Sequence, residues 1–344
     1  MRASERSSRR AHRGIAAWIA AVMLASTLLV MLPQQAIARP KRLASGLMTV
    51  GITGDWPTIV DVWVPAVKWR RLQPGPHRFR FGIIADLVRK ARASGDSLRL
   101  RIMAGRFAPR WVKRRFGTVT ISEPVDDIRA TVPKWWKRGY MDVYRRFQSR
   151  LAARFDGNAT IRSVTVSGAM TIYAEPFIRG VSLSKTRTAL IRAGYSAGKD
   201  RRAILASLRA QRPWHRTRQI MAFNAWQFVR QDGTFGNSAR FTNRVMSRFR
   251  AIFGRRAILQ NNSIRAKWVR DMPRVIAPVY RHMRELGRPL SYQTARTARV
   301  GDLALVLDWC LQQGAHGVEL HRGASLQLTT TQARSYDTRL EANA

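Results

Sequence analysis

The segment Ile161–Gly180 reads IRSVTVSGAMTIYAEPFIRG, and its pattern points to the fold. It opens with an apolar alternation that includes Val164 and Val166, which is typical of a buried strand. It ends on Glu175, directly before Pro176. Because carboxylates are rarely buried alone and proline is rare in central strands, we predict a strand that leaves its sheet and places Glu175 in a loop. The alternative is that Glu175 pairs with a surface arginine.

Seven other apolar runs resemble this strand, and longer amphipathic stretches separate most of them. The predicted strands are Leu47–Thr53, Thr58–Trp69, Ser97–Gly105, the run from Ile161, Arg218–Phe223, Ala257–Asn262, Pro289–Ala295 and His316–His321. The predicted helices are Phe81–Ala93, Tyr140–Phe155, a region within Ser184–Ala210, Phe241–Phe253, Met272–Leu286 and Asp302–Gln313.

This alternation favours a parallel sheet with right-handed crossovers. Eight strand–helix units over about 280 residues predict a closed (β/α)8 TIM barrel in a single domain, residues 43–328. A polar C-terminal tail is expected over residues 329–344. The poorly patterned excursion Phe116–Lys137 is long for a compact domain, and such excursions are often functional.

Residues 1–38 have the layout of a secretory signal peptide. A basic head precedes the apolar run Ile15–Leu32, and Ala36-Ile37-Ala38 provides a small-x-small cleavage pattern. The apolar run approaches the length of a membrane span, so an uncleaved anchor is the alternative. Either way we expect the protein to be secreted or held outside the cytoplasmic membrane.

The chain is strongly basic, with 62 Lys and Arg residues against 20 Asp and Glu, a formal charge of +42. The charge is spread along the chain, whereas a nucleic-acid site would cluster it. Weak association with anionic polymers is expected from this charge. The single cysteine, Cys310, excludes an intramolecular disulfide and has the apolar neighbours of a core residue.

No nucleotide or metal motif is present. The sequence has no G-x-G-x-x-G after its first strand and no P-loop pattern, and no His, Cys and Asp cluster has the spacing of metal ligands. We therefore expect no cofactor and no metal.

Barrel active sites lie at the carboxyl ends of the strands. The side chains that we expect at this mouth are Trp69, Arg106, Tyr173, Glu175, Asn224, Trp226, Asn261, Tyr292, Gln293, Glu319 and His321. Carboxylates, amides and aromatics together suit a carbohydrate, because polar groups bind its hydroxyls and rings stack on its faces. Glycosidic hydrolysis usually needs two carboxyl groups, for which Glu175 and Glu319 are the candidates.

Several of these residues also have a purely structural interpretation. Glu319, in GVELH, could be salt-bridged inside the barrel. The tryptophans could be core or rim residues, and His321 could be a hydrogen-bonded rim residue.

Three motifs carry a resemblance to a known family. VDVWVPAVKWRRLQPGPHRFRF (60–81), YRRFQSRLAARF (144–155) and VTVSGAMTIYAEPF (164–177) together resemble the clan A glycoside hydrolases, particularly the β-galactosidase-like families. The resemblance spans roughly Leu47–Arg322. It implies a (β/α)8 barrel that hydrolyses O-glycosidic bonds, with Glu175 as the general acid/base.

The sequence departs from this family at two positions. The family has Asn-Glu at the end of strand four, whereas this chain has Ala174-Glu175, and Gln293 stands near the place of the strand-seven nucleophile. Glutamine cannot form the glycosyl-enzyme ester. We therefore weigh three hypotheses, namely a glycoside hydrolase with Glu175 as acid and Glu319 as base or ligand, a non-catalytic carbohydrate-binding relative, and a basic protein that binds anionic wall polymers.

Overall fold

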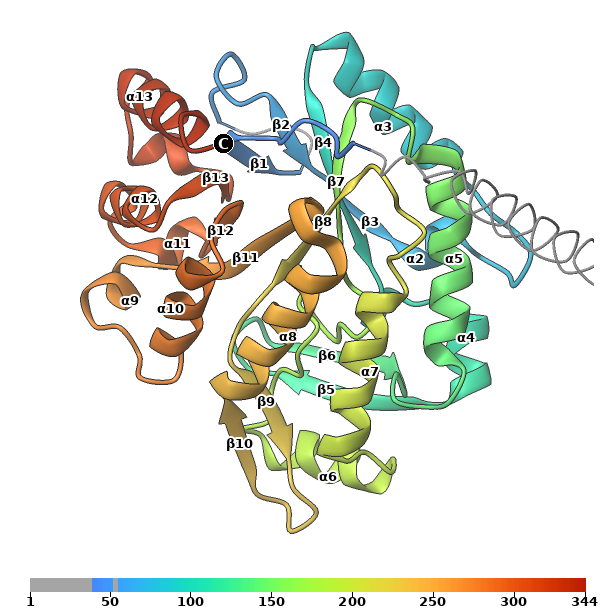
Figure 1. The fold of residues 1–344 in the computed structure, drawn as a ribbon. Helices are drawn as coiled ribbons and strands as arrows, with labels where there is room; N and C mark the ends of the chain where they lie inside the picture. The colour runs from blue at the N-terminus through green and yellow to red at the C-terminus, as the bar shows by residue number, and fades with distance from the viewer. Residues whose placement is uncertain (1–38, 52–54) are drawn as a thin grey trace, which may run out of the picture. The chain divides into compact units, whose positions relative to one another are not determined.

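The computed structural model describes residues 39–51 and 55–344, and its strands form a closed parallel ring (Figure 1). β2 pairs with β1 and with β4, which closes the ring, and the prediction of a (β/α)8 TIM barrel is confirmed. The ring consists of β1 (Gly46–Val50), β2 (Val62–Val64) with β3 (Ala66–Lys68), β4 (Ser97–Met103), β7 (Ile161–Thr165), β8 (Arg218–Ala222), β11 (Ala257–Ile264), β12 (Leu290–Thr294) and β13 (Ala315–Leu320).

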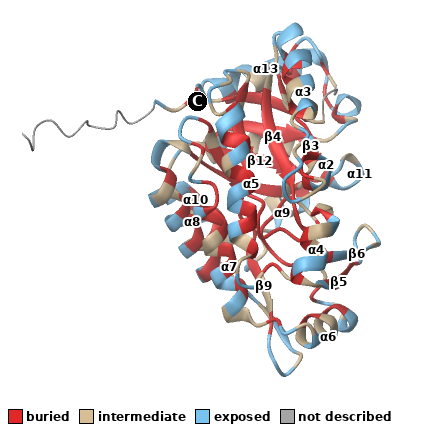
Figure 2. Cartoon of the chain, turned by 90° about the vertical axis from the view of Figure 1, so that its right-hand side faces the viewer, coloured by how far each residue is buried: buried red, intermediate tan, exposed pale blue. Residues whose placement is uncertain are grey.

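Helices cover the outside of the ring, and their buried sides face the strands (Figures 1 and 2). They are α2 (Trp69–Leu72), α3 (Gly82–Ala93), α4 (Arg110–Phe116), α5 (Tyr140–Phe155), α6 (Ser184–Arg192), α7 (Ala197–Arg209), α8 (Ala239–Phe253), α9 (Ala266–Arg270), α10 (Ala277–Glu285), α11 (Thr297–Val300), α12 (Leu303–Gln312) and α13 (Thr330–Glu341). Short 3-10 helices occupy Gly105–Phe107, Gly254–Arg256 and Ala324–Leu326.

Helix α5 illustrates why these stretches are helical. Tyr140, Tyr144, Phe147 and Leu151 recur every three or four residues and are fully buried. This spacing places them along one face of a helix, which packs on the barrel. The predicted helix has the same bounds as the observed one.

Two antiparallel hairpins and helix α6 lie at one end of the barrel (Figure 1). The excursion that the sequence left unpatterned forms the hairpin β5 (Thr118–Glu123) and β6 (Ile128–Pro133), and β9 (Trp226–Val229) pairs with β10 (Phe235–Ser238). Gly180 has a φ of +72°, and a side chain there would overlap the Ser122 carbonyl. The loop after β7 therefore packs closely against the first hairpin.

The second predicted strand and the predicted C-terminal tail differ in the structure. The second predicted strand is split at Pro65, which has no N–H to donate to a ladder. Residues 330–341, expected in a polar tail, form α13, whose Ala333, Tyr336 and Leu340 are buried.

The predicted signal segment 1–38 lies outside the described residues. Within the described part of the chain, no helix has both the length and the apolar character needed to cross a membrane.

Candidate functional site

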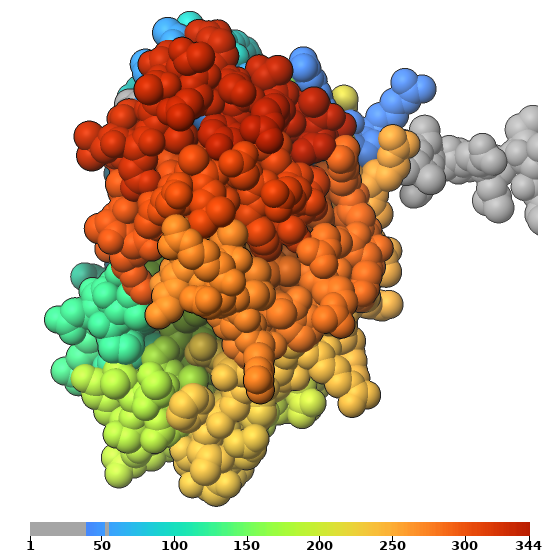
Figure 3. All heavy atoms as spheres, turned by 90° about the vertical axis from the view of Figure 1, so that its left-hand side faces the viewer, coloured from blue at the N-terminus to red at the C-terminus, as the bar shows by residue number. Residues whose placement is uncertain are grey.

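A cleft of about 320 Å³ opens at the carboxyl ends of the barrel strands. Its walls come from the ends of the barrel strands, from the β5–β6 hairpin and from the loops after β7, β11 and β12. In Figure 3 the orange segment that contains α9 and the green segment of the hairpin form neighbouring parts of one face. This is where barrel active sites lie.

Five of the side chains predicted at the mouth line this cleft. They are Tyr173, Glu175, Asn224, Gln293 and His321. Asn224 is nearly buried, and its Nδ2 has no hydrogen-bond partner among the described residues. A buried donor without a partner carries a free-energy cost, so this amide is suited to receive a ligand oxygen.

Glu175 is buried, and its Oε2 accepts a hydrogen bond from Arg179 in a salt bridge. Arg179 lies four residues further along the sequence, in the same loop after β7, and it also lines the cleft. A carboxylate has four acceptor positions, so one arginine contact leaves capacity for ligand hydroxyls. The structural alternative raised for Glu175, pairing with an arginine, is therefore present.

The β5–β6 hairpin adds two carboxylates that the sequence analysis did not propose. Glu123 and Asp126 both line the cleft, and the Tyr173 hydroxyl lies 2.9 Å from Glu123 Oε2 and 2.6 Å from Asp126 Oδ2. Burial and these two hydrogen bonds raise the pKa of Tyr173. Asp126 also pairs with Arg296 at 3.0 Å. The hairpin thus forms an acidic wall.

Glu319 lies beneath the cleft, fully buried, in a network of charges inside the barrel. Arg99 Nη1 donates to its Oε1 at 2.9 Å, and Arg101 forms a salt bridge with its Oε2. Burial alone would raise the pKa of Glu319, but the charges of Arg101 and Arg99 outweigh it and lower the pKa. Both oxygens are engaged, so this position favours a structural role over the predicted base or ligand role.

Asn261 and Tyr292, predicted as mouth residues, point to the helical layer. The Asn261 Oδ1 accepts from Tyr280, and Tyr292 packs edge-on against Trp309. Side chains alternate between the two faces of a strand, so a shift of one residue decides which of them faces the mouth.

Trp69, Trp226 and Arg106 also lie outside the cleft lining. Trp69 is fully buried and stacks on Phe147, while Trp226 Nε1 donates to the buried carboxylate of Asp200 at 2.8 Å. Arg106 lies over the ring of Phe107. Both tryptophans are core residues, which is the structural interpretation raised above.

The strand end of β11 contributes two consecutive residues, Asn262 and Ser263, to the cleft. A regular strand would point one of them away. Here the register shifts between Asn262 and Ile264, and Ser263 has a φ of 66°. Such a bulge re-aims side chains and is common beside functional sites. The sequence carries no clear signal for it.

The cleft also contains Trp268 and five arginines, none of which was proposed from the sequence as a site residue. The arginines are Arg101, Arg179, Arg265, Arg296 and Arg299. In a chain with 62 basic residues, no single arginine stands out in the sequence.

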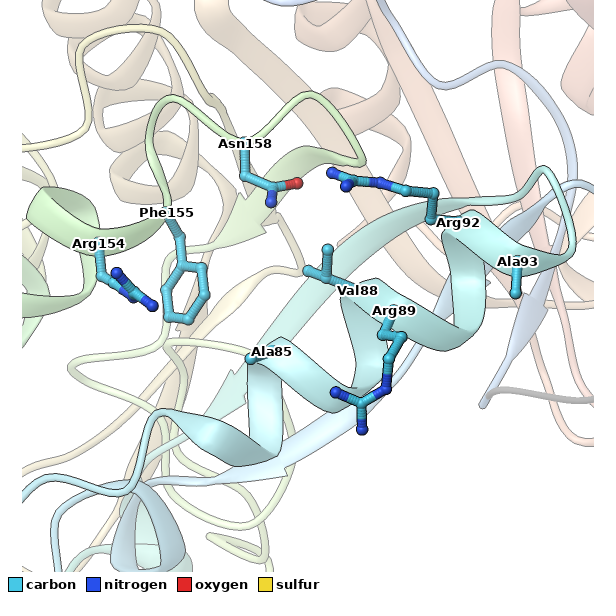
Figure 4. A pocket seen from close by; sticks show the side chains of 8 residues that line it. All are labelled: Ala85, Val88, Arg89, Arg92, Ala93, Arg154, Phe155 and Asn158. Carbon is cyan, nitrogen blue, oxygen red and sulfur yellow. The ribbon is translucent and has the colours of Figure 1, made fainter.

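A larger hollow of about 580 Å³ lies on the side of the barrel between α3 and α5 (Figure 4). Its lining is mostly Ala, Val, Phe and Arg, with Asn158 as the one amide and no carboxylate. It lacks the amide and carboxylate set of the mouth, so we regard the smaller cleft as the candidate site.

Within residues 39–51 and 55–344, no group of three or more His, Cys, Asp or Glu side chains is arranged to hold a metal ion. No protein-family model matches the chain. No curated protein sequence matches it either.

Among solved structures, the chain is similar to the catalytic domain of the β-amylase from Paenibacillus polymyxa, with 12% identity and a TM-score of 0.51 over 83% of this chain and 93% of that one. It is also similar to a β-galactosidase from Rahnella sp. R3 (10% identity, TM-score 0.49) and one from Marinomonas ef1 (9%, 0.49), of which it spans 56% and 59%. At these identities the likeness shows the fold alone, a TIM barrel distantly similar in structure to these glycoside hydrolases.

Proposed function

We propose that this protein binds a carbohydrate at the mouth of its barrel. The observation that carries the proposal is that the amides of Asn224, Asn262 and Gln293 line the same cleft as the Glu175 carboxylate. Amides and carboxylates pair with sugar hydroxyls, and the unpartnered Asn224 Nδ2 provides a donor for one of them. The signal-like residues 1–38 support a location outside the cytoplasmic membrane.

Binding without turnover is the form of this proposal that the geometry favours. Hydrolysis usually needs two carboxyl groups that flank the scissile bond. Glu319 is buried below the cleft between two arginines, and Gln293 stands where the resemblance expects a nucleophile. Neither of these side chains provides a free second carboxylate.

The test is calorimetric titration of a panel of neutral and charged oligosaccharides. Gln293→Ala is expected to weaken binding of the preferred sugar about tenfold. The substitution removes the neutral hydrogen bond between the amide and a sugar hydroxyl, and it removes the packing of the side chain against the sugar. Gln312→Ala, an exposed glutamine on α12, is the matched control and should leave the affinity unchanged. If no oligosaccharide in the panel binds, the proposal is wrong.

Hydrolysis is the second candidate, and a specific observation supports it. Glu123 and Asp126 line the same cleft as Glu175, so the hairpin could provide the second carboxylate that Glu319 does not. If this holds, the wild type releases reducing ends from the bound sugar, and Glu175→Gln and Glu123→Gln each lower the rate about 100-fold. Tight binding with no release over a long incubation would leave the binding proposal in place.

A further inference from the structure

The arginines of the cleft differ in whether a carboxylate balances them. Arg101 pairs with Glu319, Arg179 with Glu175 and Arg296 with Asp126. Arg265 and Arg299 have no acidic partner among the described residues. These two therefore leave part of the cleft wall with unbalanced positive charge.

Arg265 directly follows β11, and its surroundings hold it in place. Its guanidinium lies 4.1 Å from the centroid of the Trp268 ring, and its Nε is buried without a hydrogen-bond partner among the described residues. An arginine stacked in this way keeps its planar donor fork in a fixed orientation.

The electrostatic surroundings of Arg265 are unfavourable in the free protein. Burial lowers its pKa most, and the positive charge of Arg299 lowers it further. Tyr280 opposes this effect, and Arg179 adds a smaller lowering of the pKa. A desolvated cation beside like charges costs free energy unless an anion is present. An anionic ligand group would remove this cost.

We propose that the cleft selects a carbohydrate that carries a carboxylate, a uronic acid residue, and that Arg265 and Arg299 bind this carboxylate. The inference rests on the proposed function, whose amides bind the hydroxyls of the same ligand. A planar carboxylate matches the guanidinium fork with two parallel hydrogen bonds, which a neutral hydroxymethyl group cannot form.

The experiment compares pairs of oligosaccharides that differ only at C6. Oligomers of glucuronate, galacturonate and mannuronate are titrated beside the matching glucose, galactose and mannose oligomers. Dextran sulfate, a sulfated glycan without carboxylates, is added as a separate anion. The preferred uronate should bind at least tenfold more tightly than its neutral partner in 0.15 M salt.

Non-specific attraction is the main competing explanation, because the whole chain is basic. The double variant Arg265→Gln/Arg299→Gln removes two charges from the cleft, and Arg92→Gln/Arg154→Gln removes two exposed charges from the lateral hollow in Figure 4. Uronate affinity should fall at least tenfold in the first variant and stay unchanged in the second. Thermal melts of both variants verify that they fold.

Each other outcome has a distinct meaning. Equal loss in both double variants shows general charge attraction and overturns the inference. Equal affinity for neutral and acidic partners overturns it too, while the proposed function stands. If dextran sulfate binds more tightly than every uronate, the cleft prefers a sulfate group to a carboxylate, and the inference is overturned. Absence of binding to all the oligosaccharides contradicts the proposed function itself.

Discussion

At and below the floor of the cleft, Arg101 and Arg99 pair with one buried carboxylate, Glu319. In the wall of the cleft, Arg265 and Arg299 have no carboxylate partner among the described residues. Arg99 also donates hydrogen bonds to Gln260 on β11 and Ser291 on β12, so it links several strands of the barrel. The arginine above, Arg265, is held mainly by a ring. The two groups differ in their counter-charge. Arg99 and Arg101 share the Glu319 carboxylate inside the fold, and for Arg265 and Arg299 the proposed ligand would supply it.

The largest expected effect comes from breaking the matched network. Glu319→Gln leaves two buried guanidinium groups without a counter-charge, which should lower the free energy of unfolding by about 3–5 kcal/mol. Asp308→Asn is the control, because the exposed Asp308–Arg339 pair should contribute about 0–1 kcal/mol. Denaturant unfolding of both variants measures the contrast, and an equally small loss in each would show that the network is not structural.

The next effect concerns His316, which is fully buried below the cleft near Arg99. Burial and then the charge of Arg99 lower its pKa well below the ordinary value. Below about pH 6.5 the unfolded chain therefore binds a proton that the folded chain does not, and stability falls as the pH falls. Relative to His316→Phe, the wild type should lose about 1.4 kcal/mol of unfolding free energy per pH unit.

The comparison with His316→Phe is needed because other groups titrate in the opposite sense. Burial raises the pKa of Asp200 to about 6 and that of Asp337 to about 6, so both add stability as the pH falls toward 4. These contributions cancel in the difference between wild type and variant.

The barrel was predictable because its strands are buried on both faces and read as apolar runs. Seven of the eight predicted runs overlap one observed strand each, and the remaining run, Thr58–Trp69, is split at Pro65 into β2 and β3. Which face a side chain takes was less predictable. Asn261 and Asn262 are adjacent, and only the bulge in β11 explains why Asn262 and Ser263 both reach the cleft.

The hairpin and the arginines escaped prediction for different reasons. β5 (TVTISE) and β6 (IRATVP) each alternate apolar and polar residues, which was a readable strand signal that the sequence analysis missed, so Glu123 and Asp126 were not assigned to the mouth. The arginines belong to a background of 62 basic residues, and only tertiary structure shows which of them lack a partner. For α13, by contrast, the spacing of Ala333, Tyr336 and Leu340 was a readable signal.

A smaller effect is expected at the acidic wall. Tyr173→Phe removes the hydroxyl that lies between Glu123 and Asp126. Among the described residues, Glu123 then keeps only the Asp126 backbone N–H and Asp126 keeps Arg296 as a donor, so the two like charges lose the donor that they share. We expect a loss of about 1.5 kcal/mol and faster amide hydrogen exchange in β5 and β6. Tyr336→Phe removes a hydroxyl that has a 3.4 Å contact with the Ala304 carbonyl and an interaction with the exposed Asp308, and it should lose less. Unchanged exchange in the hairpin would mean that Tyr173 does not hold this wall.

The smallest expected effect is a gain in stability, and it tests most directly whether the cleft arginines differ from those that pair with Glu319. Arg265→Gln removes a desolvated cation from beside Arg299 and Arg179, so it should raise the free energy of unfolding by about 0.5 kcal/mol at low salt. Added salt should reduce this difference in unfolding free energy between the variant and the wild type, because salt screens the repulsion between the arginines in the wild type. The control Arg89→Gln removes an exposed partner of Asp86, and it should instead lower the free energy of unfolding by about 0.3 kcal/mol.

If Arg265→Gln destabilised the protein by more than about 1 kcal/mol, as the loss of a structural hydrogen bond does, Arg265 would have a structural role like that of Arg99 and Arg101. The wall would then be part of the scaffold, and the case for an anionic ligand would weaken with it. A gain in stability has the opposite meaning, because the folded protein then retains a cation that costs it free energy. Such a cost is expected at a position whose counter-charge arrives with the ligand.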